Sequence, residues 1–431
     1  MRSDMPKVLH PLAGRPMIVH VMATLHSLAP ARQIVVIGTQ SDAVARTVKP
    51  AQIAVQDPPL GTGHALLCAR DALTDATGTV IVLFGDSPLV TPDTLHRLVA
   101  AREAGAAVAV LGFTPDDPGQ YGRLVCDTSG ALMRIVEFKD ADERERQIGL
   151  CNGGVMALDA AVLPGLLAKL DNNNAQGEYY LTDVVRHARA AGLACAVVEG
   201  RADEVLGVNS RAELAQAEAV LQDRLRERAM AEGATLLDPK TVYLSHDTKL
   251  GRDVVIAQNV VFGPGVVVGD RVTVKPFCHL EGARIENDAV VGPFARLRPG
   301  AFVGDHAHVG NFVELKNTRL EAGAKANHLT YLGDAVIGSG ANIGAGTITC
   351  NYDGFEKFTT TIGAGAFIGS NSALVAPVTI GPGAYVGSGS VVTEDVAADA
   401  LAIARGRQVA RAGWAAAFRR RKQDAKTKKG D

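Results

Sequence analysis

The sequence predicts an α/β domain with a mostly parallel, Rossmann-like sheet, followed by a parallel β-helix built from six-residue repeats. The chain has 431 residues, which exceeds one ordinary core and favours two domains. Aromatic residues make up only 5% of it, while glycine occurs 46 times. A core of Ala, Val, Ile and Leu with many glycines favours repetitive or α/β architecture over an aromatic-rich sandwich.

Residues 1–208 alternate between helical and extended patterns. Residues 17–28 form an apolar-rich candidate helix, whereas 33–38 (QIVVIG) and 79–84 (TVIVLF) are short, nearly all-apolar runs. Such runs fit parallel strands that are buried on both faces. Strands that alternate with helices predict a mostly parallel sheet whose ligands bind at the carboxyl ends of its strands.

A charged, alanine-rich stretch without Gly or Pro runs from residue 210 to residue 232. Leu214, Ala217, Leu221 and Leu225 form a single stripe on a helix of this stretch. The sequence therefore predicts a linker helix over residues 209–232.

From about residue 250 an internal repeat takes over. Large apolar residues recur every six positions in three series, which run from Leu250 to Leu280, from Ile285 to Leu315, and, after Ile337 and Ile343, from Ile362 to Val392. Each unit supplies one short strand and one turn, and three units close one coil. This pattern resembles the hexapeptide-repeat family of left-handed β-helices, a fold that we expect over residues 233–414. Many members are acyltransferases, but others are carbonic anhydrases or oligomerisation modules.

Charge, cysteines and hydropathy exclude several classes of protein. The net charge is −2, from 44 basic and 46 acidic residues, which gives no overall attraction to nucleic acid or membranes. Six scattered cysteines without a C-x-x-C pair indicate free thiols in a reducing compartment. We find no apolar run long enough to span a bilayer and no signal-peptide pattern. The cytoplasm is the expected location.

Polar residues on the repeats suggest an anion site. Residues eighteen apart should lie one above the other, and Arg298 and Lys316 have this spacing. Two such cations repel each other by about 3 kcal/mol at an effective dielectric constant near 20. They form either a solvated basic face or a site for a sugar phosphate. Arg296 and Glu314 share the spacing and are read equally well as a plain ion pair.

The repeat is irregular in two places. His328 lies in the first, residues 326–333, and a histidine with its ordinary pKa of about 6.5 suits a general base. It could equally cap a loop. The second interruption, residues 350–361, predicts a loop with Asn351, Tyr352 and Lys357 as its polar candidates.

Four segments make the resemblance specific: GPFARLRPG (292–300), GNFVELKN (310–317), NHLTYLGD (327–334) and GANIGAGTITCNYDG (340–354). They look like the acetyltransferase half of the bifunctional enzyme family that makes UDP-N-acetylglucosamine for peptidoglycan and lipopolysaccharide. The resemblance implies a homotrimer with sites between adjacent β-helices, no metal in this half, and acetyl transfer from acetyl-CoA to glucosamine 1-phosphate. It implies His328 as general base, with Glu314 orienting or polarising His328. The implied sugar-phosphate contacts are Arg298, Lys316, Tyr331, Asn342 and Lys357. The implied acetyl-CoA contacts are Ala345, Asn351, Tyr352, Ser370 and Arg405, with Ser388 in the same groove, where the family often has a small apolar residue.

The N-terminal half resembles the uridylyltransferase half of the same family. The matching segments include PKVLHPLAGRPM (6–17), LGTGHA (60–65), GDSPL (85–89), YGR (121–123), CNGG (151–154) and GVN (207–209). The resemblance implies uridylyl transfer from UTP to N-acetylglucosamine 1-phosphate. It implies Asp86 and Asn209 as Mg²⁺ ligands, with Asn209 also near the nucleotide. The implied substrate contacts are Lys7 at phosphate, Gln56, Gly61 and Thr62 at uracil, and Gly122, Glu137 and Asn152 at the sugar.

One departure concerns the start of the chain. The family opens with a strand and a glycine-rich phosphate loop ending in Met, and Met1 falls at that position. We therefore expect that this strand and loop are missing from this chain and that its uridylyl transfer is impaired. A true start upstream of Met1 is the simplest explanation, and genuine loss of this activity, which leaves an acetyltransferase-only protein, is the alternative. At the other end, residues 415–431 form a basic tail that we expect to be disordered.

Three rival functions stay open at this point. One is a sugar-nucleotide pyrophosphorylase whose β-helix is only structural. Another is a metal-dependent lyase like the carbonic anhydrases of this fold, with His306, His308 and His328 as its ligands. The third is a non-catalytic scaffold that binds no acetyl-CoA.

Overall fold

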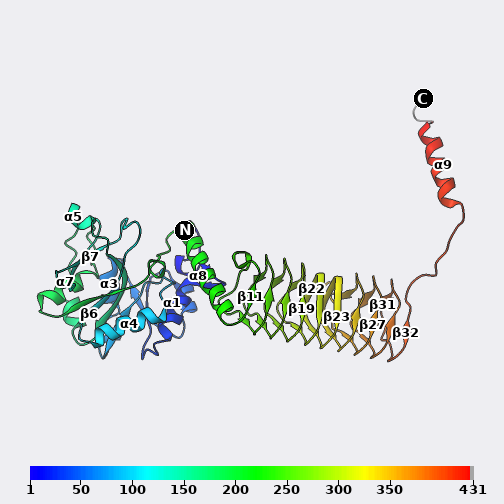
Figure 1. Cartoon of the computed structure of the whole chain (residues 1–431), viewed down its shortest axis with the longest axis horizontal. Coiled ribbons are helices and arrows are strands. Elements are labelled where there is room, and N and C mark those ends of the chain that lie inside the picture. The colour runs from blue at the N-terminus through cyan, green and yellow to red at the C-terminus, as the bar shows by residue number, and fades with distance from the viewer. Residues whose placement is uncertain (428–431) are drawn as a thin grey trace. The chain divides into compact units, whose positions relative to one another are not determined.

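The computed structural model describes residues 1–427 of the chain (Figure 1). It divides into two compact units. The first contains residues 1–228 and 244–246, and the second contains residues 229–243 together with those from 247 onward. The linker helix of the sequence-based prediction is present as α8 (Arg211–Ala231), and most of it belongs to the first unit.

The first unit is an α/β domain. Its other helices are α1 (Met17–His26), α2 (Asp42–Thr47), α3 (Thr62–Cys68), α4 (Pro92–Glu103), α5 (Glu143–Arg146), α6 (Leu163–Leu167) and α7 (Asp183–Ala190). Short 3-10 helices occupy Lys7–Leu9, Arg70–Leu73 and Ala202–Glu204. Local sequence explains the helix boundaries in cases such as α4, where the Thr91 side chain accepts a hydrogen bond from the backbone N–H of Thr94 and Pro92 occupies the first turn.

The main sheet of this unit is mixed, so the prediction of a mostly parallel sheet was wrong. Its strands are β5 (Thr79–Val82), β6 (Val108–Phe113), β7 (Arg123–Cys126), β8 (Leu132–Val136), β9 (Cys151–Asp159) and β10 (Cys195–Glu199). Only β10 and β6 pair in parallel, whereas β9 runs antiparallel to β5, β6 and β7. An apolar run indicates a buried strand but carries no information about its direction.

Smaller sheets complete the unit. Strands β3 (Ile34–Gly38) and β4 (Gln52–Gln56) form a separate two-stranded parallel sheet, and β1 (Pro11–Leu12) and β2 (Arg15–Pro16) form an antiparallel hairpin. The predicted strands at 33–38 and 79–84 exist as β3 and β5, but both are half-buried. The strand buried at every position is β6.

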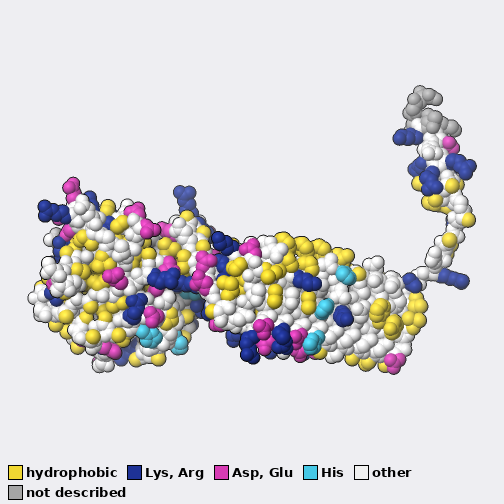
Figure 2. All heavy atoms as spheres, viewed as in Figure 1, with side chains coloured by type: hydrophobic (Ala, Val, Ile, Leu, Met, Phe, Trp, Pro, Cys, Tyr) yellow, Lys and Arg dark blue, Asp and Glu magenta, His cyan; other side chains and the backbone are white. Residues whose placement is uncertain are grey.

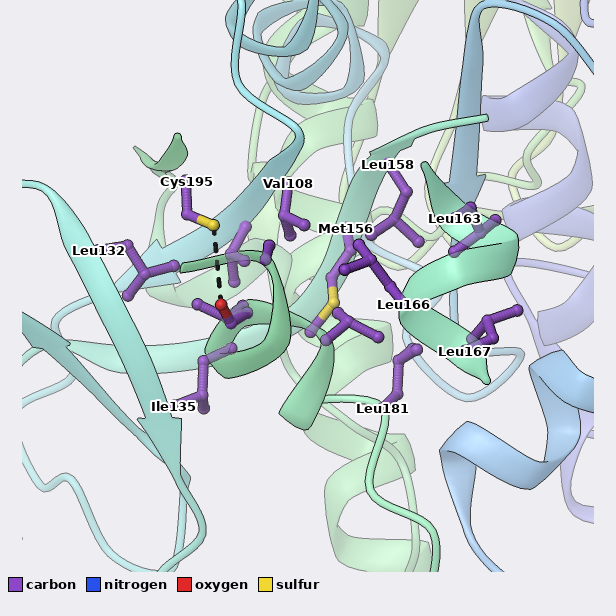
Figure 3. Close-up of a cluster of buried hydrophobic side chains, with 14 of the residues drawn as sticks. Val108, Leu132, Ile135, Met156, Leu158, Leu163, Leu166, Leu167, Leu181 and Cys195 are labelled. Atoms are coloured by element: carbon purple, nitrogen blue, oxygen red, sulfur yellow. Dashed lines mark hydrogen bonds between the residues drawn. The ribbon is translucent and has the colours of Figure 1, made fainter. Parts of the chain in front are cut away.

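The largest core of the first unit lies between the main sheet and the helices α6 and α7. Figure 3 shows Met156 and Leu158 of β9 beside Leu163, Leu166 and Leu167, while Leu132 and Ile135 approach from the other side. The Cys195 thiol also lies in this core, 3.9 Å from the Val185 carbonyl oxygen. This packing fixes β9, which carries Asn152 of the predicted sugar site.

The second unit is a parallel β-helix, as the six-residue repeat predicted. Its strands are β11 (Thr235–Leu236), β12 (Lys249–Leu250), β13 (Val255–Ile256), β14 (Val261–Phe262), β15 (Val267–Val268), β16 (Thr273–Val274), β17 (His279–Leu280), β18 (Ala283–Ile285), β19 (Val290–Val291), β20 (Arg296–Leu297), β21 (Ala301–Val303), β22 (His308–Leu320), β23 (Lys325–Ile337), β24 (Asn342–Ile343), β25 (Ile348–Cys350), β26 (Thr360–Ile362), β27 (Phe367–Ile368), β28 (Ala373–Val375), β29 (Val378–Ile380), β30 (Tyr385–Val386), β31 (Val391–Val392) and β32 (Leu401–Ala402). A 3-10 turn occupies Pro239–Thr241.

Strands three apart in the chain stack in parallel, which is the signature of a three-sided coil. The predicted apolar series fills the interior: its members are buried, apart from the half-buried Leu250 at the start. The eighteen-residue spacing holds for Arg296 and Glu314, whereas Arg284 lies over Val267, seventeen residues earlier. The left-handed winding stays a prediction.

The two interruptions of the repeat have different structures. Residues 351–359 form a loop between β25 and β26, as predicted. Residues 326–333 do not form a loop, because β22 and β23 are two long strands paired along most of their length. Here the polar side chains are outward-facing strand positions, and a one-residue slip in spacing mimics an interruption.

The basic tail is helical where the structure describes it, so the prediction of disorder was wrong there. Helix α9 spans Trp414–Thr427, and the rings of Trp414 and Phe418 stack at 5.2 Å. Ala, Arg, Lys and Gln are strong helix formers, which explains the helix without any packing partner. Residues 428–431, including Lys428 and Lys429 of the predicted tail, lie outside the described residues.

Among residues 1–427, no helix is both long and apolar enough to cross a membrane.

Candidate active sites

A cluster of three cations lies on the β-helix. Arg298 follows β20 and Lys316 lies on β22 in the next coil, since Leu297 pairs with Leu315. The amino groups of Lys316 and Lys357 interact directly: this contact lowers the pKa of Lys357 and raises that of Lys316. The charge of Arg298 lowers the pKa of Lys357 further. Mutually repelling cations that stay together form a ready site for an anion.

A carboxylate and an amide complete this cation cluster. Asp334 Oδ2 lies 3.5 Å from Lys316 Nζ and accepts a hydrogen bond from the Asn351 amide. Burial raises the pKa of Asp334, but hydrogen bonds from Asn317 and Asn351 and the charge of Lys316 outweigh it, so its pKa is lowered. The hydroxyl of Tyr331 lies close to Gly333 and to the Asn351 amide. Four predicted residues, Lys316, Lys357, Tyr331 and Asn351, therefore converge.

Glu314 does not contact His328 within the described part of the chain. Its carboxylate accepts a 2.9 Å hydrogen bond from Arg298 and lies 3.9 Å from Arg296. The ion-pair interpretation of Glu314 is therefore confirmed, with Arg298 as the closer partner. Its role in orienting the base stays a prediction.

His328 lies on β23 with its ring exposed. Its Nδ1 atom lies 2.6 Å from Asn311 Oδ1 on β22, in the neighbouring coil. Its backbone carbonyl accepts hydrogen bonds from the Thr330 hydroxyl at 2.7 Å and from the Gly346 N–H at 3.4 Å. The other ring nitrogen has no hydrogen-bonding partner among residues 1–427. Such a ring can accept a proton from a substrate.

The predicted acetyl-CoA residues fall into two groups. Ala345, Ser370 and Ser388 occupy equivalent positions in successive coils, because Ile343 pairs with Ile368 and Ile368 with Val386. Arg405 lies one coil further, near Gly389. Asn351 and Tyr352 lie instead on the 351–359 loop, where the Tyr352 hydroxyl donates to the Gly354 carbonyl.

Asn342 is the predicted substrate residue that this chain does not bring to the cation cluster. It pairs with Lys325 on one side and Phe367 on the other. Among the described residues, no three His, Cys, Asp or Glu side chains are grouped to hold a metal ion.

The first unit brings the two predicted metal ligands together. Lys7 Nζ donates to Asp86 Oδ2 at 2.5 Å and to Asn209 Oδ1 at 2.7 Å. The backbone explains this meeting: the Val208 N–H donates to the Asp86 carbonyl at 2.9 Å, which fixes Asn209 beside Asp86. A Cβ on Gly85 would lie 2.9 Å from the Cδ1 atom of Ile18 and 3.3 Å from Cγ1 of Val8, so glycine leaves room for the close packing of the Lys7 segment.

The side-chain oxygens of Asp86 and Asn209 both contact the ammonium group of Lys7. Two oxygens that converge on one positive charge are what a Mg²⁺ site requires. Carboxylate and amide oxygens are hard ligands of the kind that Mg²⁺ prefers, and substrate phosphates usually supply further ones. The residues therefore fit a divalent ion, with Lys7 available to move to a phosphate.

The predicted sugar contacts also meet. The backbone N–H of Asn152 donates to the Gly122 carbonyl at 2.8 Å, and a Cβ on Gly122 would lie 3.4 Å from Glu137 Oε2. Burial raises the pKa of Glu137, while a hydrogen bond from the Thr182 hydroxyl opposes this effect. Glu137 is thus a half-buried carboxyl group that can accept hydrogen bonds from sugar hydroxyl or amide groups.

The predicted uracil contacts form a third group. The Gln56 amide donates to the Gly61 carbonyl at 2.9 Å, and Thr62 Oγ1 accepts from the Leu181 N–H at 3.2 Å. Gly61 has φ of +103°, and a Cβ there would lie 2.7 Å from the Tyr179 carbonyl oxygen. This close approach explains why glycine is needed at the start of α3.

Sequence reasoning missed three residues that the structure places at these sites. Asp334 was quoted only as part of a motif, and Thr182 lies in a segment whose spacing predicts no contact with Glu137. Asn311 lies seventeen residues before His328, so the eighteen-residue rule does not pair them. For Asn311, a signal existed in the one-residue slip of the apolar series.

Comparisons with known proteins agree with this architecture. Residues 1–149 match the MobA-like NTP transferase domain, and residues 247–282 and 359–394 match the bacterial transferase hexapeptide repeats. Fold and sites together therefore define an NTP transferase domain joined to a hexapeptide-repeat transferase. The chain is 61% identical to the bifunctional protein GlmU of Rhodospirillum rubrum, covering 97% of this chain and 94% of that protein. It is 57% identical to the protein of the same name from Paramagnetospirillum magneticum, covering 100% of this chain and 96% of the relative.

The chain belongs to the GlmU family of bifunctional transferases. This confirms the sequence-based prediction of an acetyltransferase joined to a uridylyltransferase that makes UDP-N-acetylglucosamine. The prediction of a truncated protein with an impaired uridylyltransferase half is not confirmed. The nucleotidyltransferase domain matches residues 1–149, and the relative from Paramagnetospirillum magneticum aligns over 100% of the chain.

Proposed function

We propose that the cation cluster and His328 perform acetyl transfer from acetyl-CoA to glucosamine 1-phosphate. The observation that carries this assignment is the cluster of Arg298, Lys316 and Lys357 on the same β-helix as an exposed histidine, whose second ring nitrogen has no hydrogen-bonding partner in the described part of the chain. The cations bind the phosphate, and Tyr331 and Asn342 contact the sugar. Ala345, Ser370, Ser388 and Arg405 line a column for acetyl-CoA, with Asn351 and Tyr352 on the loop.

In this reaction the amine nitrogen attacks the thioester carbonyl carbon. Nε2 of His328 takes the amine proton as the C–N bond forms, and the tetrahedral oxyanion is stabilised by nearby amide groups. The C–S bond then breaks, and the CoA sulfur leaves with the proton that the imidazolium returns. Glu314 keeps Arg298 in place for the phosphate.

The first unit is proposed to transfer uridylyl from UTP to N-acetylglucosamine 1-phosphate. Asp86 and Asn209 hold Mg²⁺, which neutralises phosphate charge when it is bound. Lys7 contacts phosphate, Gln56, Gly61 and Thr62 contact uracil, and Gly122, Glu137 and Asn152 contact the sugar. The convergence of Asp86 and Asn209 oxygens on one cation supports this assignment.

A test of both activities uses one preparation of the chain. CoA release from acetyl-CoA and glucosamine 1-phosphate follows the first transfer, and Mg²⁺-dependent pyrophosphate release follows the second. We expect both to occur. Absence of CoA release would reject the acetyltransferase assignment and favour a β-helix that is only structural.

We also propose that the β-helix forms a homotrimer. Phe277, Phe294 and Phe312 stack in successive coils, with ring centroids 4.9 and 5.1 Å apart, and all three are about half exposed. Leu329 continues this column and is 62% exposed. All four have left-handed φ values between 50° and 61°, which cost bulky residues about 1–2 kcal/mol each. A second copy packed on this apolar column offsets that cost.

The apolar column lies beside the base, since Phe312 follows Asn311 and Leu329 follows His328. Replacing Phe294 and Phe312 by Asp should therefore convert the trimer into monomers. Acetyl transfer should fall at least about 100-fold, because correct positioning of the substrates contributes several kcal/mol to lowering the reaction barrier. Uridylyl transfer should stay within about twofold, as the other unit is untouched. Light scattering after size exclusion measures the mass. Val261→Asp, an exposed apolar residue outside the column, is the control, and a trimeric double variant would contradict the proposal.

The lysine pair predicts an unusual pH dependence. Because Lys316 lowers the pKa of Lys357, Lys357 loses its proton at a lower pH than an ordinary lysine. The KM for glucosamine 1-phosphate should therefore rise with pH in a range where an ordinary lysine stays charged. Lys316→Met should raise KM about tenfold or more by removing one charged contact, and should move the pH-dependent rise to higher pH. A pH dependence unchanged from the parent would contradict this, and Lys249→Met serves as control.

The cysteine thiols bear on the compartment in which the protein works. All six cysteines are free, which supports the cytoplasm as the proposed compartment.

A further inference from the structure

The ring of His328 is held by a residue that sequence reasoning missed. Asn311 on β22 and His328 on β23 face each other in the register of the two long strands. The Asn311 Oδ1 atom lies 2.6 Å from Nδ1 of the imidazole. This is a well-formed hydrogen bond between neighbouring coils rather than a contact along one strand.

The backbone of the histidine is held as well. Its carbonyl oxygen accepts hydrogen bonds from the Thr330 hydroxyl and the Gly346 N–H, and the next residue, Leu329, has a left-handed φ of 50°. Thr330 is itself buried. Among residues 1–427, the hydrogen bond with Asn311 is the one that holds the ring itself rather than the backbone of His328.

The chemistry of the pair fixes which nitrogen can act. If the amide oxygen accepts from Nδ1–H, the lone pair of the neutral ring stands on Nε2. After Nε2 takes a proton, Nδ1–H remains a donor and the amide oxygen stabilises the imidazolium. In the described part of the chain, the groups that hydrogen-bond to His328 are uncharged, namely Asn311 from β22, Gly346 after β24 and Thr330 on its own strand. No ion pair involves His328 among residues 1–427.

We propose that Asn311 is a positioning residue for the base of acetyl transfer. It acts through His328, by fixing the tautomer with Nε2 unprotonated and by holding the ring toward the amine. This inference rests on the proposed role of His328 and assigns the orienting function to Asn311 rather than to Glu314, whose carboxylate contacts Arg298 and Arg296.

The test compares Asn311→Ala, Asn311→Asp and Asn311→Leu in the full chain. Asn311→Ala and Asn311→Leu should lower kcat for acetyl transfer about 10- to 100-fold, part of the contribution of a general base. The KM for both substrates should change less than about twofold, because no substrate contact is removed. Uridylyl transfer by the same preparation should be unchanged and reports that the protein is intact, and the oligomer mass is measured alongside.

Asn311→Asp separates a positioning role from a merely structural one. A carboxylate can accept from Nδ1–H but cannot donate, so this variant should recover most of the kcat lost in Asn311→Ala. Its charge also stabilises the imidazolium, so the acid limb of kcat/KM against pH should move to higher pH. Activity of Asn311→Asp as low as that of Asn311→Ala, or an unshifted acid limb, would overturn the proposal.

His328→Ala, assayed in parallel, distinguishes the role of His328 as the base from the role of Asn311 in positioning it. Full activity of His328→Ala would reject His328 as the base and with it the proposed function of the site. Loss of activity in His328→Ala with an unchanged kcat in Asn311→Ala would reject only the role of Asn311.

Discussion

His328→Ala should reduce acetyl transfer about 10²- to 10⁴-fold, the usual contribution of a general base. The fall should appear in kcat, because the phosphate-binding cations and the acetyl-CoA column are not altered. His328 is exposed, and its ring has one hydrogen-bonding partner in the described part of the chain, so its removal should leave folding and oligomer mass intact. CoA release at saturating substrates is the measurement.

A matched control is available on the same β-helix. His306 is also an exposed histidine, with 72% of its side chain accessible and its Nε2 4.0 Å from Asp288. His306→Ala should retain acetyl transfer within about twofold, as expected for a surface substitution. Equal losses in both variants would point to a shared metal site of the kind considered from the sequence, and unchanged turnover in His328→Ala would remove it as the base.

The β-helix could be predicted because its signal is repeated in every coil. An apolar residue at each sixth position, as at Ile256, Phe262 and Val268, identifies the interior face independently of any long-range contact. What the repeat could not predict is how coils align where the spacing slips. The contact between Asn311 and His328 depends on a seventeen-residue coil, and the contact between Lys316 and Lys357 depends on the path of a nine-residue loop, 351–359.

The α/β unit was predicted less completely for a physical reason. Strand β9 contains the apolar run that marks a buried strand, but its antiparallel direction is set by the connections on either side, which composition does not encode. The structure nevertheless brings the predicted site residues of this unit together in three groups, and close backbone approaches at Gly61 and Gly122 belong to two of them. The roles of these residues stay predictions. Glu137 and Thr182 lie in distant segments, and nothing in their spacing predicts that the two side chains meet.

Asp86→Asn should reduce Mg²⁺-dependent uridylyl transfer about 100-fold or more. The substitution keeps the shape of the side chain and removes its charge, and a metal ion at a transferring phosphate contributes several kcal/mol. Lys7 would also lose its ion pair, although its bond to Asn209 would remain. The Mg²⁺ concentration for half-maximal pyrophosphate release should rise in the variant, which separates loss of metal binding from general damage.

Asp93→Asn is the matched control for this variant, because Asp93 is an exposed acid of the same unit, paired with Arg97 at 3.2 Å on α4. It should retain uridylyl transfer within about twofold, and both variants should retain acetyl transfer, since the β-helix site is separate. An Asp86→Asn protein with the parental Mg²⁺ dependence would show that Asp86 only anchors Lys7. In that case Asn209→Ala should also leave the Mg²⁺ dependence of uridylyl transfer unchanged, because the Asp86 and Asn209 oxygens both accept from the Lys7 amino group.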